Sequence, residues 1–166
     1  DRLEDGIALI AETLSVQKAG NGGTDPAILS LIRAHVTSHE QRKRYDCAVA
    51  LQRLLVETLR RETKTDPLET ATEVSRLGGD LLKLDKFDEA RNELQQALET
   101  FTAKAPDNWR RWVTQTMLGT ALTGLKEFDK AEPLLLEANE HLQAAIGVNA
   151  SYKSNALRGL AALYKA

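Results

Sequence analysis

Apolar residues recur along this chain at intervals of three and four, the spacing that places side chains on one face of a helix. Two such series are Leu77, Leu81, Leu84 and then Ala90, Leu94, Ala97, Phe101. We find no stretch that alternates apolar and polar residues in the manner of a half-buried strand. Turn-forming residues divide the chain into segments of roughly a dozen to twenty residues, the ordinary length of a helix. The pattern predicts an all-α protein of about eight antiparallel helices.

Helix starts are marked by capping residues. Asp25-Pro26 and Asp66-Pro67 each place a side chain that can cap a helix before a proline, whose missing N–H costs nothing at the first helical position. Asn108 and Asn149 stand at the corresponding places later in the chain. We therefore expect helices to begin at regular intervals.

An internal repeat explains this regularity. An aromatic residue followed by aspartate and, two positions later, alanine occurs at Tyr45, Phe87 and Phe128, which are 42 (87 − 45) and 41 (128 − 87) residues apart. Leu3-Glu4-Asp5-Gly6 is a weaker copy one step earlier. Such periodicity is typical of an α-α superhelix (solenoid), in which each helix pair buries its apolar face against the next. We expect one array over residues 1–166, with a second helix only in 1–24, helix pairs in 25–65, 66–105 and 106–148, and a first helix only in 149–166.

Composition excludes several classes of partner. The chain has 22 Lys and Arg against 24 Asp and Glu, a net charge of −2, which provides no field to attract nucleic acid or an acidic membrane surface. No apolar run approaches the ~20 residues that a membrane-spanning helix requires. The single cysteine, Cys47, excludes an internal disulfide. We expect protein or peptide partners, no nucleic acid and no direct membrane insertion.

The repeats resemble those of tetratricopeptide repeat (TPR) proteins, in which a leucine and a small residue precede an aromatic residue and then alanines. The matching positions are Leu77-Gly78, Phe87, Ala90 and Ala97, and then Leu118-Gly119, Phe128, Ala131 and Ala138. The step is about eight residues longer than the ordinary ~34-residue repeat, which is similar to the kinesin-light-chain variety. The resemblance implies a noncatalytic module that presents a concave groove to a peptide or protein surface.

Two further stretches resemble the repeat tails of bacterial serine/threonine protein kinases. The first is residues 105–109 leading to residues 118–119 and then 131–135, and the second is residues 2–10 with residues 12–14. This resemblance implies the regulatory or sensor tail of a signalling kinase, in the cytoplasm or, as an alternative, in the extracytoplasmic part of a membrane-anchored kinase.

In such arrays the first helix of each pair lines the groove. Carrying this over by register gives the following candidate groove residues: Ser30, Arg33, Thr37, Thr72, Ser75, Gly79, Lys83, Val113, Thr116, Thr120, Thr123, Asn155, Arg158 and Ala162. Three of them, Arg33, Lys83 and Arg158, are positive without a matching acid in the set. We therefore expect an extended peptide that bears a carboxylate. The alternative is a solvated face whose partner binds elsewhere.

Other residues invite chemical interpretations. His35 and His39 lie four apart, a spacing found in some zinc sites, but no further ligands accompany them, so we expect them to fill the core of a helix pair. Cys47 is expected to be a packing residue rather than a nucleophile. We expect Trp109, Trp112 or both to cover a seam between repeats, with Arg110 and Arg111 in solvent.

The sequence therefore predicts a protein-interaction module with no catalytic residues, no metal and no cofactor. A second hypothesis is a structural spacer or self-association element without a separate ligand, which would associate through its terminal helices.

Overall fold

The computed structural model describes Gly6, Glu12 and residues 25–62 and 65–166, and these residues form helices joined by turns, with no strand among them. The chain divides into two compact units, the N-terminal unit (residues 1–66) and the C-terminal unit (residues 67–166). The all-α prediction is confirmed.

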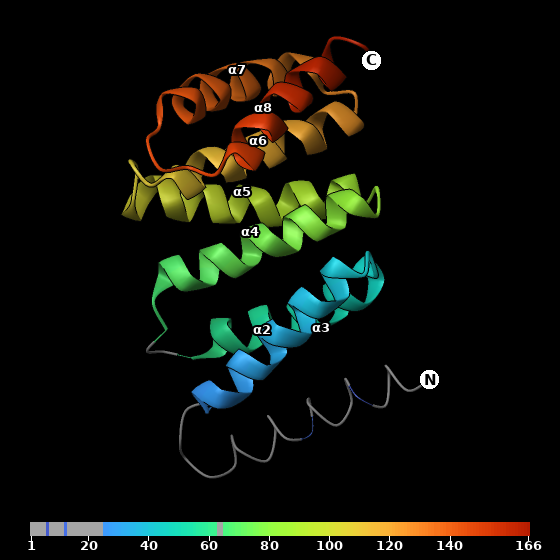
Figure 1. Cartoon of the computed structure of the whole chain (residues 1–166), viewed down its shortest axis with the longest axis vertical. Helices are drawn as coiled ribbons and strands as arrows, with labels where there is room; N and C mark the ends of the chain where they lie inside the picture. The colour runs from blue at the N-terminus through green and yellow to red at the C-terminus, as the bar shows by residue number, and fades with distance from the viewer. Residues whose placement is uncertain (1–5, 7–11, 13–24, 63–64) are drawn as a thin grey trace. The chain divides into compact units, whose positions relative to one another are not determined.

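The helices fall in the expected segments. The N-terminal unit contains α2 (Pro26–Gln41) and α3 (Tyr45–Arg61). The C-terminal unit contains α4 (Pro67–Lys83), α5 (Phe87–Lys104), α6 (Trp109–Gly124), α7 (Phe128–Ala144) and α8 (Ala150–Leu163), and Figure 1 shows α4 with α5 and α6 with α7 as antiparallel pairs. The helix expected in residues 1–24 lies outside the described residues, except for Gly6 and Glu12. One continuous array over residues 1–166 stays a prediction.

The helix starts follow from local chemistry. The Asp25 carboxylate accepts a hydrogen bond from the Ala27 N–H at 2.8 Å, and the Asn108 and Asn149 side chains accept from the N–H groups two residues later at 3.0 and 2.9 Å. Each bond satisfies one of the donors that the first turn of a helix leaves unpaired. Acidic residues also lie in the first turns of α3, α5 and α7, where the helix dipole favours negative charge. The caps at Asp25, Asn108 and Asn149 were predicted.

The turns inside the three helix pairs repeat one geometry. Lys43, Asp85 and Lys126 each have positive φ, at 56°, 55° and 62°. The N–H of the following residue bonds back to a carbonyl five residues earlier, as from Lys86 to Leu81 at 3.0 Å and from Glu127 to Leu122 at 2.9 Å. This pattern is a Schellman cap built without glycine. It reverses the chain within three residues and so places the second helix directly against the first.

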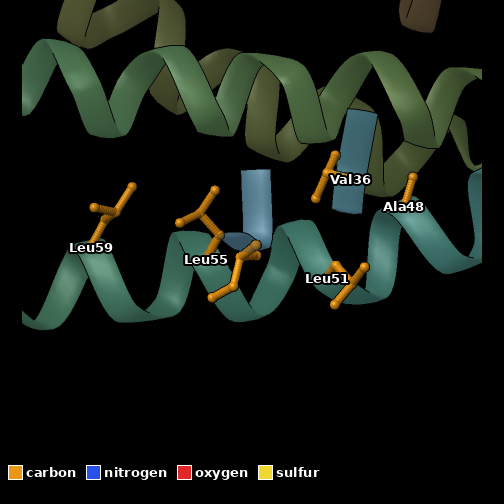
Figure 2. Close-up of a cluster of buried hydrophobic side chains, with 6 residues drawn as sticks. Val36, Ala48, Leu51, Leu55 and Leu59 are labelled. Atoms are coloured by element: carbon orange, nitrogen blue, oxygen red, sulfur yellow. The ribbon is translucent and has the colours of Figure 1, made fainter. Parts of the chain in front are cut away.

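Branched apolar residues form the core of the N-terminal unit. Ile32 and Val36 of α2 are fully buried with four residues of α3, namely Ala48, Leu51, Leu55 and Leu59, and Figure 2 shows the α3 side chains in a row along one face of the helix. This one-sided burial is what the helical spacing of apolar residues predicts.

In the C-terminal unit, two glycines allow the paired helices to approach closely. A Cβ placed on Gly78 would lie 2.4 Å from Leu94 Cγ, and one on Gly119 would lie 2.6 Å from Leu135 Cγ. Both leucines are fully buried. The Cβ on Gly119 would also lie 3.4 Å from the Ala131 carbonyl oxygen, so a leucine side chain occupies the space beside each glycine and, at Gly119, the backbone of α7 is close as well.

Candidate interaction surface

The first helices of the C-terminal unit, α4, α6 and α8, pack against one another in that order. Between α4 and α6, the hydroxyl groups of Ser75 and Thr114 form a buried hydrogen bond of 2.7 Å. Between α6 and α8, a Cβ on Gly159 would lie 3.5 Å from Thr120 Oγ1. Small side chains therefore hold the three helices side by side.

One stripe of residues on these helices reaches solvent. Its members are spaced three and four apart, which places them on one side of each helix. We call this set the first-helix face: Thr72, Arg76, Gly79 and Lys83 on α4; Val113, Met117, Thr120 and Thr123 on α6; Asn155 and Ala162 on α8. The stripe is continuous from α4 to α6, because a Cβ on Gly79 would lie 3.1 Å from Met117 Sδ.

The structure corrects the placement of two candidate groove residues. Ser75 and Thr116 are only 7% and 5% exposed, and their hydroxyl groups are engaged by Thr114 and by the Trp112 carbonyl. They face the seams between first helices, not an open surface. Arg158 holds the same repeat position 42 residues after Thr116 (158 − 116), but it is exposed on α8 and donates to Asn155 at 3.3 Å.

Hydrogen bonding limits what the remaining threonines can offer a ligand. Thr72, Thr120 and Thr123 donate their hydroxyl protons to carbonyls of their own helices, at 2.7, 2.9 and 2.9 Å. A hydroxyl group has one proton, so these oxygens can only accept a further bond. They suit N–H groups and not carboxylates. Lys83 and Arg158 are the exposed cationic candidates in this unit that can hold an acid, and Arg158 already donates to Asn155.

The other candidates lie in the N-terminal unit. Arg33 is half-buried on α2, and Thr37 donates to its carbonyl at 3.0 Å, while Ser30 is exposed. These residues belong to the first helix of their own pair, as expected.

The histidines do not fill the core. His35 is exposed and His39 is half-buried, so the expectation that they replace core leucines is wrong. Burial, with Arg44 and His35 nearby, lowers the pKa of His39, whose Nδ1 is buried without a hydrogen-bond partner. Among the described residues, no three His, Cys, Asp or Glu side chains come together in a group that could hold a metal ion.

Cys47 is a packing residue. Its side chain is 1% exposed, and burial, together with a hydrogen bond to Asp46, raises the pKa of its thiol. A raised pKa disfavours the thiolate, which is the nucleophilic form of cysteine.

Trp109 contacts the following repeat, as expected, while the ring of Trp112 stacks inside its own helix pair. Trp112 stacks on His141 of α7, with ring centroids 3.7 Å apart, and Trp109 contacts Tyr152 of α8 at 5.1 Å. The expectation for Arg111 is wrong, since its guanidinium lies 4.1 Å from the Trp112 ring and donates to the Pro106 carbonyl at 3.2 Å.

Lys153 was not among the residues that the sequence pattern indicated. Its Nζ donates to the carbonyls of Gln143 and Ala145 at 3.0 and 2.8 Å, and so caps the C-terminal end of α7. A lysine in the first turn of the following helix was the available signal.

Comparison with solved structures identifies proteins of similar fold. BtubC (BKLC) from P. vanneervenii superposes with a TM-score of 0.66 over 99% of this chain, at 20% identity, and this chain spans 66% of that protein. A Podosopora anserina protein described as a kinesin light chain with nearly identical TPR-like repeats superposes with a TM-score of 0.66 over 98% of this chain, at 14% identity, and its Q17M variant with 0.68. This chain spans 78% and 77% of those structures.

The chain has a TPR-like repeat fold. These identities are low, so the likeness concerns the fold alone. No protein-family model matches the chain, and no curated protein matches it. TPR-like repeats are typical of noncatalytic protein-interaction and scaffold modules. Within the described residues, every helix is too short or too polar to cross a membrane.

Proposed function

We propose that this chain is a noncatalytic protein-interaction module whose C-terminal unit binds an extended peptide along the first-helix face. The observation that carries the proposal is the continuous stripe across α4 and α6. Ser75, Thr114 and Thr116 are buried between the helices, so the stripe consists of the neighbouring residues on these helices that reach solvent.

The hydrogen-bonding capacity of the stripe indicates which groups of a peptide its residues can bind. Thr72, Thr120 and Thr123 offer acceptor oxygens, which suit the N–H groups of a peptide backbone. Lys83 stands at the C-terminal end of α4, and within the described ranges no hydrogen bond or ion pair engages its ammonium group. In this proposal, the ammonium group of Lys83 therefore binds the carboxylate of the ligand. A surface built on packed helices loses little freedom on binding, which favours affinity.

The test uses peptides selected from a random display library on the intact chain. Peptides that carry a carboxylate should lose at least about tenfold in affinity for the Lys83→Glu variant, which corresponds to about 1.4 kcal/mol. Lys104→Glu on α5 is the control, because it makes the same charge change on an exposed residue of a second helix. Equal losses in both variants would refute recognition through the first-helix face.

Attachment to a bacterial serine/threonine kinase is a further proposal, supported by the resemblance of residues 105–109 and 131–135 to kinase tails. Reading the coding sequence upstream of Asp1 tests it, and a catalytic loop there is the expected result.

A further inference from the structure

The side of α6 that carries the first-helix face continues to Arg110, in the first turn of this helix. Arg110, Val113, Met117 and Thr120 are spaced three, four and three residues apart, so they lie on one side of α6. The Arg110 side chain is exposed, and within the described part of the chain no hydrogen bond or ion pair engages its guanidinium group. This side of the unit therefore offers a cation on α6 as well as Lys83 on α4.

An aromatic ring holds the guanidinium group of Arg110 in place. Its Cζ lies 4.6 Å from the ring centroid of Trp109, to which a cation is attracted by the ring quadrupole. Trp109 in turn contacts Tyr152 of α8, with ring centroids 5.1 Å apart. A side chain positioned in this way loses less freedom when a ligand binds, and its fork of N–H donors matches the two oxygens of a carboxylate.

Contacts between α4 and α6 fix how far apart the two cations lie. The bonded hydroxyl groups belong to residues 39 apart (114 − 75), and the contact of Gly79 with Met117 joins residues 38 apart (117 − 79). The two helices therefore run in the same direction, and Arg110 lies level with residue 71 or 72 of α4. Lys83 follows that level by 11 or 12 residues (83 − 72, 83 − 71), which is about 17 Å at ~1.5 Å per residue.

An extended peptide spans this distance in about five residues, because it rises ~3.3 Å per residue. The flexibility of the two cationic side chains allows roughly one residue more or less. Acceptor hydroxyl groups lie along the same path, since Thr72 is level with Arg110 and Thr120 is close to the level of Lys83. These oxygens suit the backbone N–H groups between the two ends of the ligand.

We propose that the first-helix face binds an extended peptide with two acidic residues roughly four to six positions apart. Arg110 holds one carboxylate and Lys83 holds the other. This inference rests on the function proposed above and adds to it a second anchor and a spacing.

The test begins with the peptides that a random display library yields on the intact chain. Pairs of acids at this spacing should be enriched among them relative to the unselected library. For one such peptide, fluorescence anisotropy should show that Arg110→Gln weakens binding about tenfold or more. Lys104→Gln, which removes an exposed cation from α5, should leave binding unchanged.

Replacing each acid of the peptide by its amide shows which cation holds which acid. One replacement should remove the effect of Arg110→Gln and preserve that of Lys83→Gln, and the other replacement should do the reverse. Such specific coupling identifies the contacting pairs, because a general loss of charge would affect both variants equally.

Two further variants test how the Arg110 anchor works. Trp109→Leu keeps an apolar side chain beside Tyr152 but removes the ring, so it should weaken binding several-fold in the parent chain and not in the Arg110→Gln background. A merely structural role of Trp109 would weaken both. Glu69→Gln removes an exposed acid one turn before Thr72, so it should strengthen binding about twofold. Circular dichroism checks that each variant is folded.

Two results would overturn the second anchor: a selection without enrichment of paired acids, and equal affinities of the Arg110→Gln variant and the parent chain. If Lys83→Gln still weakened binding in either case, recognition through the first-helix face would stand with a single anchor. If neither Lys83→Gln nor Arg110→Gln differed from Lys104→Gln, both the second anchor and the proposed function would be refuted.

Discussion

Two adjacent glycines in α4 provide a sharp test of how the helix pairs are packed. Replacing glycine by alanine inside a helix normally stabilises it by about 1 kcal/mol, because alanine loses less backbone freedom on folding. At Gly79 the new Cβ would meet Met117 Sδ at 3.1 Å. Methionine is flexible and can give way. Gly79→Ala should therefore stabilise the protein by about 0.5 to 1 kcal/mol.

Gly78→Ala should have the opposite effect. Its Cβ would lie 2.4 Å from Leu94 Cγ, far inside the ~3.5–4.0 Å separation of contacting carbons. Leu94 is fully buried, so it can move only by displacing the core. Overpacking of this kind costs about 1–3 kcal/mol, which cancels or exceeds the gain in helix propensity. The two variants should therefore differ by about 1–3 kcal/mol.

Urea unfolding followed by circular dichroism measures both variants, and hydrogen exchange of the α4 and α5 amides shows where stability changes. Leu94→Ala, combined with Gly78→Ala, supplies the decisive comparison. The loss of unfolding free energy in the double variant should be smaller than the sum of the two single losses, by about 0.5 kcal/mol or more. The reason is that the smaller side chain at position 94 removes the clash. If Gly78→Ala raised the urea midpoint as much as Gly79→Ala does, the close approach of α4 and α5 would be refuted.

Three further predictions concern the turns and caps. Lys126→Gly should stabilise the protein by about 1 kcal/mol in urea unfolding, because glycine adopts the positive φ of 62° without strain, whereas Lys130→Gly in a helix should destabilise it. Lys153→Met should cost about 1 to 2 kcal/mol by removing the hydrogen bonds to the end of α7, and an unchanged midpoint would contradict the cap. Hydrogen bonds from Lys130 and Arg91 hold the pKa of Glu127 in the folded protein below its usual value. The stabilisation that Glu127 provides is therefore present above the pKa of the unfolded chain, and it is lost as the pH falls through the pKa of the folded protein. In acid titrations, Glu127→Gln should therefore lose less stability on acidification than the parent chain.

Local signals predicted the helices well because they act over a few residues. The caps at Asp25, Asn108 and Asn149 form as expected, since a side chain and the N–H two positions later meet in any helix start. The Schellman turns were not predicted at residue level. Lys43 and Lys126 adopt a conformation that glycine usually supplies, so the sequence offered no local sign of it.

The candidate surface was predicted less well, because side-chain direction depends on neighbours. Ser75 and Thr116 were assigned to an open groove, yet both face the adjoining first helix. His35 was expected in the core from its register with Leu77, yet it is exposed. Register identifies equivalent positions, but it does not say which helix covers them.

Periodicity and capping are properties of the local chain, so they were enough to predict the all-α class, the repeat of 41 to 42 residues and the starts of the helices. The packing of the helices, in contrast, decides which polar residues meet solvent, and it shows that the threonine hydroxyls of the first-helix face retain only acceptor capacity. The reason is that burial and hydrogen bonding between helices depend on how closely and at what angle they cross. That crossing is set by pairs such as Gly78 and Leu94, which are distant in the chain.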